Sequence, residues 1–533
     1  MGVAEHLSEL IIKNKRALPA ILAFVVVIWI YAFSDARGPY YLAHNLDPDY
    51  CYLLNALNII NGRAPAHVDH PGTTLQCFEA LILQLLHPAS SPYDLTVMVL
   101  AKPEQYLEII SSVLIALFIA SYVALGYLVY RRTRSAFAVF AVQAAPFLDP
   151  EIFLSVTRVY PETLSLILAN LLACVMLSMG EDAEAGSVSY QPSIWLGLVG
   201  ASLIVTKMLA APIIAFLPVM LRNGRERIYF SVALLFGGAL FMLPIYSKFG
   251  VVMKWIALNL FHTQRYGVGP PGIIDPSTYF FNLWQGFAVH PSLGFLLGIA
   301  FSALLLVSFM APPDSQGLRL RRAVAGLSLG FVVSILVVSK SPEPHYLILP
   351  VALSGLLFYF SVCLFELRFP AHGRTIRTMA AGGLLLLAAV LQLNTYKQYK
   401  TLKAQREFAR QACDYVAGRE KTATVAGAYA ASSPTYALAF GNSLADYTYT
   451  FVLRDLYPHA YHYDIWGNGL SRFDMAQQRA LGPPMVGDLL LQGTALTDER
   501  AAKAGALLQP RRAASLVAQF GPEKIYLLKI SGN

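Results

Sequence analysis

Apolar runs long enough to cross a lipid bilayer recur along most of this 533-residue chain. A membrane-spanning helix needs about 20 predominantly apolar residues. The runs that qualify, some of them short, lie near residues 17–34, 107–130, 135–148, 161–179, 193–206, 208–221, 228–246, 292–311, 323–339, 345–366 and 378–394. This pattern predicts a polytopic α-helical membrane protein with about 11 transmembrane helices. The apolar stretch 73–86 is shorter and predicts an interfacial or re-entrant helix.

The composition argues against a long soluble protein. Hydrophobic residues make up 56% of the chain and charged residues only 14%, whereas about a quarter of the residues in soluble domains are charged. The formal net charge of +8 would suit a nucleic-acid-binding protein. However, Lys and Arg gather in short loops between the predicted spans, where such residues set membrane orientation. We therefore expect membrane lipids, and no nucleic acid, as partners.

Basic clusters occupy alternate loops and predict the topology. They comprise Arg131, Arg132 and Arg134; Arg222, Arg225 and Arg227; Arg319, Arg321 and Arg322; and Arg368, Arg374 and Arg377. The positive-inside rule places these loops and the N-terminus in the cytoplasm. The basic residues at 13–16 resemble the start of a signal peptide, but no small-residue cleavage site follows, so we expect an uncleaved first span. The expected location is the plasma membrane, compatible with a bacterial inner membrane.

Two domains are expected. Residues 1–394 would form the transmembrane domain with a long first outer loop at 35–105, and residues 395–533 a small extracytoplasmic (periplasmic or extracellular) α/β domain. An odd number of spans places everything after about residue 395 outside. A polar helix at 396–415 leads into short strand-like runs at 422–429, 435–440, 487–491 and 524–530, with helices near 471–481 and 498–506.

The first outer loop concentrates carboxylate and imidazole side chains beside the first predicted span. They are Asp47, Asp49, His67, Asp69 and His70. Carboxylates next to a membrane cost free energy unless they face water, a partner or a substrate. We therefore expect a hydrated, functional loop. A simpler interpretation of Asp47 is an N-cap for the helix that begins after Pro48.

Two further interpretations of this loop stay open. The segment 67–70 holds two histidines and an aspartate, but their spacing matches no strong metal-ligand signature. Hydrogen bonding to a polar substrate is the preferred interpretation, and a requirement for a divalent metal is left undecided. A disulfide between Cys51 and Cys77 is compatible with the predicted topology, which puts both on the oxidising side.

The other outward turns supply cations and one more acid at the ends of predicted spans. These candidates are Arg158, Tyr160, Glu162, Lys207, Arg265, Lys340, His345 and Tyr346. Glu162 would either compensate a helix dipole or join the loop carboxylates. Lys207 would either snorkel or bind a lipid phosphate. Cations beside carboxylates at several turns predict one site with positive charge for a phosphate and a carboxylate for proton abstraction.

In the order of these elements, the chain resembles the GT-C-fold membrane glycosyltransferases, which include protein O-mannosyltransferases and aminoarabinose transferases. The likeness covers about residues 15–395 and rests on an acidic motif, Asp47 with Asp49, after the first span. It continues with the segments 69–73 (DHPGT) and 158–162 (RVYPE). The Thr206-Lys207 turn and the segment 345–350 (HYLILP) complete it. In the family the two acids are commonly adjacent Asp-Glu, whereas here a proline separates two aspartates.

The resemblance implies transfer of a sugar from a polyprenyl-phosphate-linked donor to a glycan, lipid or protein acceptor on the outer face, usually with inversion. Asp47 or Asp49 would be the catalytic base, and Asp69, His70, Tyr160 and Glu162 would add polar contacts to the substrates. The leaving lipid phosphate would be held by cations and a tyrosine, namely Arg158, Lys207, Arg265, Lys340, His345 and Tyr346. Some members of the family use a divalent metal and others do not.

Other functions remain as alternatives. A polymerase or ligase that uses a lipid-diphosphate oligosaccharide would share much of this chemistry. A glycolipid flippase or transporter would need ionisable residues at mid-membrane, but the interiors of the predicted spans hold almost none. A receptor role for the C-terminal domain would require only one membrane anchor, which makes so many spans unnecessary.

Overall fold

The computed structural model describes residues 15–45, 49–69, 71–179, 190–308, 315–419, 423–464, 469–471, 473, 488–508 and 511–530. By its contacts the chain divides into two compact units. Unit 1 comprises Met1–Tyr31, Val68–Thr74 and Val113–Lys397, and unit 2 comprises Ala32–His67, Leu75–Ser112 and Gln398–Asn533.

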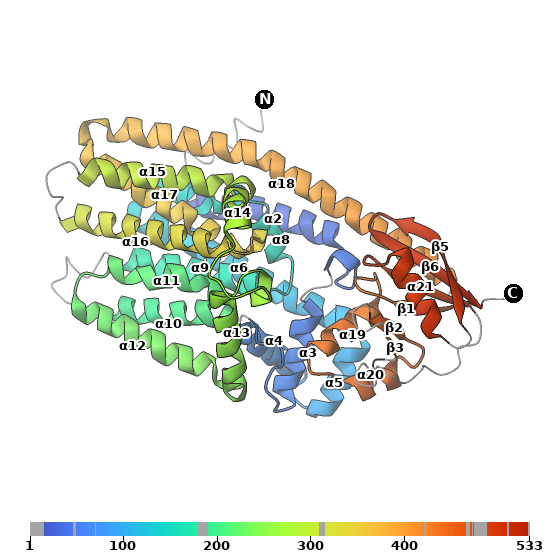
Figure 1. Cartoon of the computed structure of the whole chain (residues 1–533). Coiled ribbons are helices and arrows are strands. Elements are labelled where there is room, and N and C mark those ends of the chain that lie inside the picture. The colour runs from blue at the N-terminus through green and yellow to red at the C-terminus, as the bar shows by residue number, and fades with distance from the viewer. Residues whose placement is uncertain are drawn as a thin grey trace. The chain divides into compact units, whose positions relative to one another are not determined.

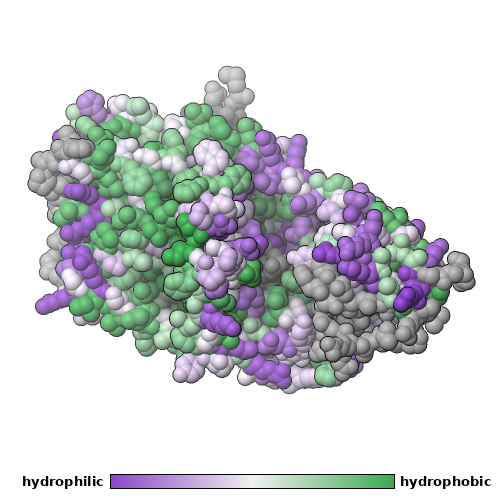
Figure 2. All heavy atoms as spheres, in the orientation of Figure 1, coloured by the Kyte–Doolittle hydropathy of each residue, from purple (hydrophilic) through white to green (hydrophobic). Residues whose placement is uncertain are grey.

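Unit 1 is built from helices (Figure 1). Those lying wholly or partly in it are α2 (Leu18–Arg37), α6 (Pro103–Thr133), α7 (Ala136–Gln143), α8 (Glu151–Val156), α9 (Pro161–Ser178), α10 (Gln191–Thr206), α11 (Ala211–Phe216), α12 (Gly224–Phe241), α13 (Phe249–Phe261), α14 (Pro276–Val289), α15 (Pro291–Ser308), α16 (Ser315–Val338), α17 (Ile348–Arg368) and α18 (Gly373–Ala417). Figure 2 shows apolar side chains over much of the visible face of these helices. Phe236 and Leu386 are 65% and 68% exposed, as expected of side chains that face lipid.

The helices confirm a multi-pass membrane protein. Among the described residues, seven helices are long and apolar enough to cross a membrane, or up to eight if the bent pair of α12 and Leu243–Phe261 is one span. The sequence suggested about 11 spans. The structure has fewer because three runs that qualify by composition form shorter elements. Run 135–148 becomes the eight-residue α7, and run 208–221 is split into 3₁₀ and α segments. Run 193–206 lies in α10, whose 16 residues rise only about 24 Å.

Small residues let α10 and α12 approach closely. Gly197 lies on α10 against the backbone of α12, and a Cβ added there would come within 2.8 Å of the Ala233 Cβ. Membrane helices use small residues in this way because lipid offers no hydrophobic driving force between helices. This packing holds the end of α10, and therefore Lys207, in a defined place.

Unit 2 combines helices from the first outer loop with a mixed sheet. Its helices include α3 (Asp49–Ile60), most of α4 (Thr73–Leu86), α5 (Pro92–Ala101), α19 (Pro434–Ser443), α20 (Thr450–Leu456) and α21 (Asp498–Leu507). The sheet has the strands β1 (Ala423–Gly427), β2 (Tyr461–Asp464), β3 (Gly469–Ser471), β4 (Asp488–Gly493), β5 (Arg512–Phe520) and β6 (Glu523–Ile530), in the order β3-β2-β1-β4-β6-β5. Strand β1 is parallel to both β2 and β4, and the other pairs are antiparallel.

The small α/β region agrees with the sequence analysis in part. The expected strands near 422–429, 487–491 and 524–530 correspond to β1, β4 and β6, and the helix near 498–506 corresponds to α21. The strand predicted at 435–440 is wrong, because this segment is the helix α19. Ser433 caps that helix by accepting a hydrogen bond from the Tyr436 N–H, and Pro434 takes the first helical position. The helix expected near 471–481 falls almost entirely outside the described residues.

The first outer loop clusters with the C-terminal segment, whereas the sequence analysis grouped it with the transmembrane bundle. Helix α3 packs on α19, and the Tyr449 hydroxyl donates a hydrogen bond of 2.7 Å to the Asn58 side chain. The Asn55 amide donates to the Leu444 carbonyl at 3.1 Å. One junction between the units, after Lys397, lies near the boundary expected at residue 394.

Candidate active site

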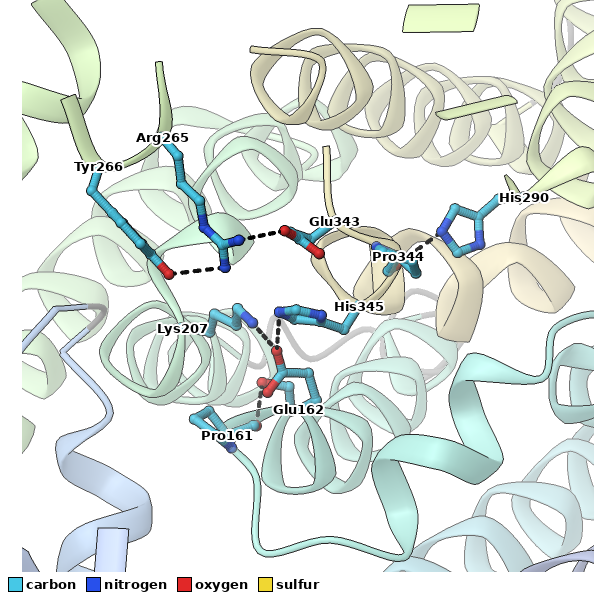
Figure 3. A network of polar contacts seen from close by, with 10 residues as sticks. Pro161, Glu162, Lys207, Arg265, Tyr266, His290, Glu343, Pro344 and His345 are labelled. Carbon is cyan, nitrogen blue, oxygen red and sulfur yellow. Dashed lines mark hydrogen bonds and ion pairs between the residues drawn. The ribbon is translucent and has the colours of Figure 1, made fainter. Parts of the chain in front are cut away.

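The candidate site in unit 1 lies where several apolar helices begin or end (Figure 3). Helix α9 begins at Pro161, which suits the first helical position, and Glu162 follows in the first turn. Helix α10 ends at Thr206, so that Lys207 takes an extended backbone conformation after it. His345 and Tyr346 lie in a 3₁₀ turn that leads into α17.

Glu162, Lys207 and His345 meet in the interior. The Lys207 ammonium donates to Oε1 of Glu162, and the same oxygen lies 3.7 Å from Nε2 of His345. Glu162 and Lys207 are 2% and 6% exposed. Two charges buried to this degree are tolerated only as a partnered pair. Of the two interpretations of Lys207, snorkelling to the surface does not fit this burial.

Aromatic rings surround this pair. The Lys207 ammonium lies 4.9 Å from the centre of the Tyr346 ring, and the Arg158 guanidinium lies 4.1 Å from the centre of the Tyr160 ring. The rings of Tyr160 and His345 are 6.4 Å apart. Such cation–π contacts stabilise a cation in a partly desolvated place.

Arg265 approaches from the loop after α13. Its guanidinium donates to Oε1 of Glu343 at 2.6 Å and to the Tyr266 hydroxyl at 3.0 Å. The Arg265 side chain remains 49% exposed. The backbones of Gln264 and Tyr266 have φ values of 62° and 58°, a conformation that costs free energy for side chains other than glycine. This strained backbone conformation on both sides of Arg265 places its side chain beside Glu343.

Lys340 lies apart from the Glu162 contacts. Its ammonium donates to the carbonyls of Asn259 and Leu260 at the end of α13. Carbonyls at the last turn of a helix have no partner within it, and a cation satisfies them. Burial lowers the pKa of Lys340. The structure thus gives Lys340 a helix-capping contact.

A second buried pair, Asp149 and His290, supports the turn that carries His345. Nδ1 of His290 is 2.5 Å from Oδ2 of Asp149, and Nε2 donates to the Pro344 carbonyl at 2.9 Å. Burial lowers the pKa of His290, but the Asp149 carboxylate outweighs this effect and raises the pKa above its usual value. Since a carbonyl can only accept, His290 holds a proton at Nε2, and the raised pKa favours a second proton at Nδ1.

In the sequence, Asp149 and His290 lie in separate loops between apolar runs, and nothing there pairs them. Their only signal was that each stands at the start of an apolar helix. Glu151, in the same turn as Asp149, is a further acid that was not selected. Burial, followed by the Asp149 carboxylate, raises the pKa of Glu151 to about 7. A carboxyl group with this pKa can exchange a proton near neutral pH.

We call Arg158, Glu162, Lys207, Arg265, Glu343 and His345 the basic cluster. Its three cations and two carboxylates leave one net positive charge when His345 is neutral. Lys207 and His345 share the Glu162 carboxylate, and Arg265 reaches Glu343, two positions before His345 in the chain. A site of this charge at the ends of apolar helices can bind an anionic headgroup whose tail remains in the lipid.

Part of the first outer loop belongs to the same unit as the basic cluster. Asp69 lies in the segment Val68–Thr74, which is assigned to unit 1. The hydroxyl oxygens of Thr74 and Thr206 are 2.5 Å apart, which ties the start of α4 to the turn that holds Lys207. Asp47 and His70 lie outside the described residues. Asp49 belongs to unit 2, so its convergence with Lys207 remains a prediction.

Within unit 2, Asp49 stands in a group of buried acids that the sequence analysis missed. Asp49 and Glu79 are both fully buried, and Glu79 has no hydrogen-bond partner among the described residues. Burial, followed by the Asp49 carboxylate, raises the pKa of Glu79 well above its usual value. Glu104 accepts hydrogen bonds from the Tyr50 hydroxyl and the Tyr40 N–H. The available signals were Glu79 within the otherwise apolar α4 and Glu104 in the first turn of α6.

The described residues contain no group of three or more His, Cys, Asp or Glu side chains placed to hold a metal ion. Cys51 and Cys77 are both free thiols, so the disulfide considered between them is not formed. The acidic segment at 47–49 and His70 are only partly described. A metal at the first outer loop therefore stays an open prediction.

Comparison with known proteins gives matches among solved structures only. No protein-family model and no curated protein matches the chain. The chain is similar to ArnT from Cupriavidus metallidurans bound to undecaprenyl phosphate, with a TM-score of 0.48, 10% identity and coverage of 96% of this chain and 98% of that one. It is also similar to ArnT in the apo state, with a TM-score of 0.49, 11% identity and coverage of 95% and 97%.

ArnT is an aminoarabinose transferase of the GT-C fold, a class named in the sequence analysis. At this identity and TM-score, the likeness carries no argument about activity. What the structure establishes is a multi-pass helical membrane protein with a small sheet region.

Proposed function

We propose that the protein is a membrane glycosyltransferase that moves a sugar from a polyprenyl-phosphate-linked donor to an acceptor on the outer face of the membrane. The observation that carries the proposal is the basic cluster, built around the buried contact of Glu162 with Lys207 and His345. The order of motifs that resembles the GT-C glycosyltransferases points to the same chemistry.

The basic cluster suits a lipid phosphate better than a soluble anion. Its residues stand at the termini of helices such as α9 and α10, whose apolar side chains would border the prenyl tail. Arg265 is half exposed and can turn toward a ligand, whereas Lys207 is held by Glu162. The phosphate would bind between these cations and share Lys207 with Glu162, because an ammonium group has three donors.

The reaction we propose is a single displacement with inversion. Asp47 or Asp49 removes the proton from an acceptor hydroxyl, and the oxygen then attacks the anomeric carbon from the face opposite the phosphate. The bond from that carbon to the phosphate oxygen breaks, and the polyprenyl phosphate leaves with the bonding electrons. A positioned base contributes about 10²–10⁴-fold to the rate.

Charge stabilisation of the departing phosphate is the task of the basic cluster. Negative charge accumulates on the leaving oxygen in the transition state, and fixed cations in a place of low dielectric stabilise it strongly. Lys207 is already oriented by Glu162 and needs no reorganisation when the charge develops. The His290–Asp149 pair would act as a positioning element, because Nε2 of His290 holds the Pro344 carbonyl next to His345.

The proposal includes an orientation. The N-terminus would be cytoplasmic, and the basic cluster, the first outer loop and the C-terminal sheet region would lie on the outer side, as the positive-inside rule predicts. The acceptor would be a glycan, lipid or protein. A divalent metal at the first outer loop is compatible with the proposal, but no step above depends on it.

The test uses the full-length protein in liposomes with a panel of undecaprenyl-phosphate-linked sugars, and it measures the release of undecaprenyl phosphate. Lys207→Met is expected to lower turnover by about 10²-fold or more. Lys254→Met removes an exposed lysine on α13 and serves as the matched control. Asp47→Asn and Asp49→Asn identify the base. Wild-type levels of release from the Lys207→Met variant, or from both aspartate variants, would refute the mechanism.

A further inference from the structure

Unit 2 contains a cleft whose lining includes neither Asp49 nor any residue of the basic cluster. Its volume is about 920 Å³, near the upper end of the range typical of small-molecule sites. It is lined by the end of α18, by the segment that enters α19 and by the segment that enters β2. Strands β1 and β4 contribute Val425, Gly427, Asp488 and Gln492. It shares no lining residue with the basic cluster.

The sheet topology marks this cleft as a ligand site. Gly427 and Gln492 are register partners at the carboxyl ends of the parallel strands β1 and β4. Helix α19, which follows β1, covers the face on which Gly427 lies, because a Cβ at Gly427 would come within 2.9 Å of Tyr436. Helix α21, which follows β4, packs on the opposite face through Ala501 and Ala504.

Connections that leave adjacent parallel strands toward opposite faces open a crevice between the strand ends. In open α/β sheets, ligands bind in this crevice. Here Gly427 and Gln492 line the cleft at the carboxyl ends of β1 and β4, whereas Asp488, the register partner of Ala423, lines it at the amino end of β4. The cleft therefore runs along the strands, and one end of it lies in the place where this architecture binds ligands.

Hydrogen bonds fix the wall formed by Ser432 and Gln492. The buried Glu523 accepts from the Ser432 N–H at 2.7 Å, the Ser432 hydroxyl at 2.8 Å and the Gln492 amide at 2.6 Å. The Ser432 hydroxyl also accepts from the Ala43 N–H at 3.0 Å. A wall that is ordered before binding lowers the entropic cost of recognition.

The chemistry of the lining selects the class of ligand. No lysine or arginine is found among the described residues that line the cleft, whereas Asp488 contributes a carboxylate. This charge disfavours phosphates and nucleotides. Tyr457 and His459 add rings, and hydroxyl and amide groups complete the polar surface. Rings for the apolar faces of a ligand and short polar side chains for its hydroxyls suit a neutral sugar.

We propose that this cleft binds a neutral saccharide as a second carbohydrate site, outside the transferase centre. The assignment rests on the proposed function only in choosing carbohydrate over other neutral hydroxylated molecules. The saccharide would lie along the cleft against Tyr457 and His459, with hydroxyl groups on Asp488 at one end and Gln492 at the other. A site of this kind would hold a glycan while its reactive end is presented elsewhere.

The experiment is saturation-transfer NMR on the full-length protein in detergent with methyl glycosides of glucose, galactose, mannose and N-acetylglucosamine. We expect at least one to bind, and Asp488→Asn to weaken binding by tenfold or more. Thr435→Trp places a bulky ring in the lining of the cleft and should abolish binding. Glu499→Gln removes an exposed carboxylate from α21 and is the matched control, which should bind as wild type does.

Two further arms separate this proposal from the transferase function. Lys207→Met should retain sugar binding even if transfer is lost, because the basic cluster contributes nothing to the cleft. Sodium phosphate should not compete. Binding of none of the four glycosides, equal binding by wild type and both cleft variants, loss of binding in Lys207→Met, or displacement by phosphate would each overturn the proposal. Asp488→Asn alters one side chain at the amino end of β4, so the test does not depend on Thr435→Trp folding.

Discussion

At the scale of single residues, the contact between Glu162 and Lys207 has opposite consequences for stability and for activity. Two buried charges compensate each other, so removal of one leaves the other unpaired in an environment of low dielectric. Removal of both charges eliminates the free-energy cost of an unpaired buried charge. Activity should follow a different rule, because the proposed leaving phosphate requires the lysine whether or not the glutamate is present.

The first prediction follows from this difference. Lys207→Met should lower the free energy of unfolding by about 3–5 kcal/mol, whereas Lys207→Met combined with Glu162→Gln should recover most of that loss. Thermal unfolding in detergent measures both. Turnover should remain low in the double variant. Recovery of turnover together with stability would show that Lys207 is structural and plays no part in the reaction.

His462 gives a second prediction at this scale, outside the membrane spans. It is 1% exposed on β2, and neither ring nitrogen has a hydrogen-bond partner among the described residues. Burial lowers the pKa of His462 to about 3. Because the unfolded chain takes up a proton near pH 6.5 and the folded protein does not, the stability contributed by the neutral histidine is complete above this pH and is lost on acidification toward pH 3.

On acidification from pH 7.5 to pH 5, protonation of His462 in the unfolded chain should lower the free energy of unfolding by about 2 kcal/mol. Replacement by phenylalanine keeps the ring contacts with Tyr436 and Phe473 and removes the titration. His462→Phe should therefore lose less stability over this range than wild type. Unfolding of both proteins monitored at several pH values provides the measurement, and parallel pH dependences would contradict the prediction.

At the scale of secondary-structure elements, the packing of α10 on α12 determines where Lys207 lies. A Cβ at position 197 would meet the backbone of Phe230 and the side chain of Ala233. A Cβ at position 238, on α12 itself, would meet nothing within 4 Å. These two glycines therefore form a matched pair that separates helix packing from helix propensity.

Gly197→Ala should destabilise the protein by about 1–3 kcal/mol, because the added methyl group forces the helices apart. Gly238→Ala should be neutral or slightly stabilising, since alanine is the better helix former. Thermal unfolding in detergent again provides the measurement. Equal effects of the two substitutions would mean that α10 and α12 do not approach as closely as described.

At the scale of the whole molecule, unit 2 is discontinuous in sequence. Helix α3 from the first outer loop buries Tyr50 and Asn58 against α19 and Tyr449 from the C-terminal segment. A chain that ends at residue 397 would expose this face of α3. We expect its amide hydrogens at 49–60 to exchange at least tenfold faster than in the full-length protein, because a twelve-residue helix without tertiary contacts is marginal in water.

Hydrogen exchange followed by mass spectrometry measures this effect, and residues 348–368 of α17 provide the internal control. Helix α17 lies wholly in unit 1, so its exchange should not change. Unchanged protection of α3 in the shortened chain would show that the first outer loop folds without the C-terminal segment.

The sequence by itself determined the class of protein and many of its elements. Runs of about 20 apolar residues can satisfy their backbone groups in lipid only as helices, so the multi-pass character and helices such as α6 and α17 followed directly. Composition alone located α4 and β4 closely. The run 435–440 was assigned the wrong structure, because β-compatible side chains there were outweighed by the Ser433 cap and by burial on α3.

Tertiary structure decided which polar residues meet. The choice of Glu162, Lys207 and His345 as candidates came from their positions at span ends, but their pairing depends on how α9, α10 and α17 pack. The same is true of Asp149 with His290, which are 141 positions apart in the chain. Hydrophobic periodicity records which side of a helix is buried, whereas a polar contact between distant segments depends on the packing of the complete chain.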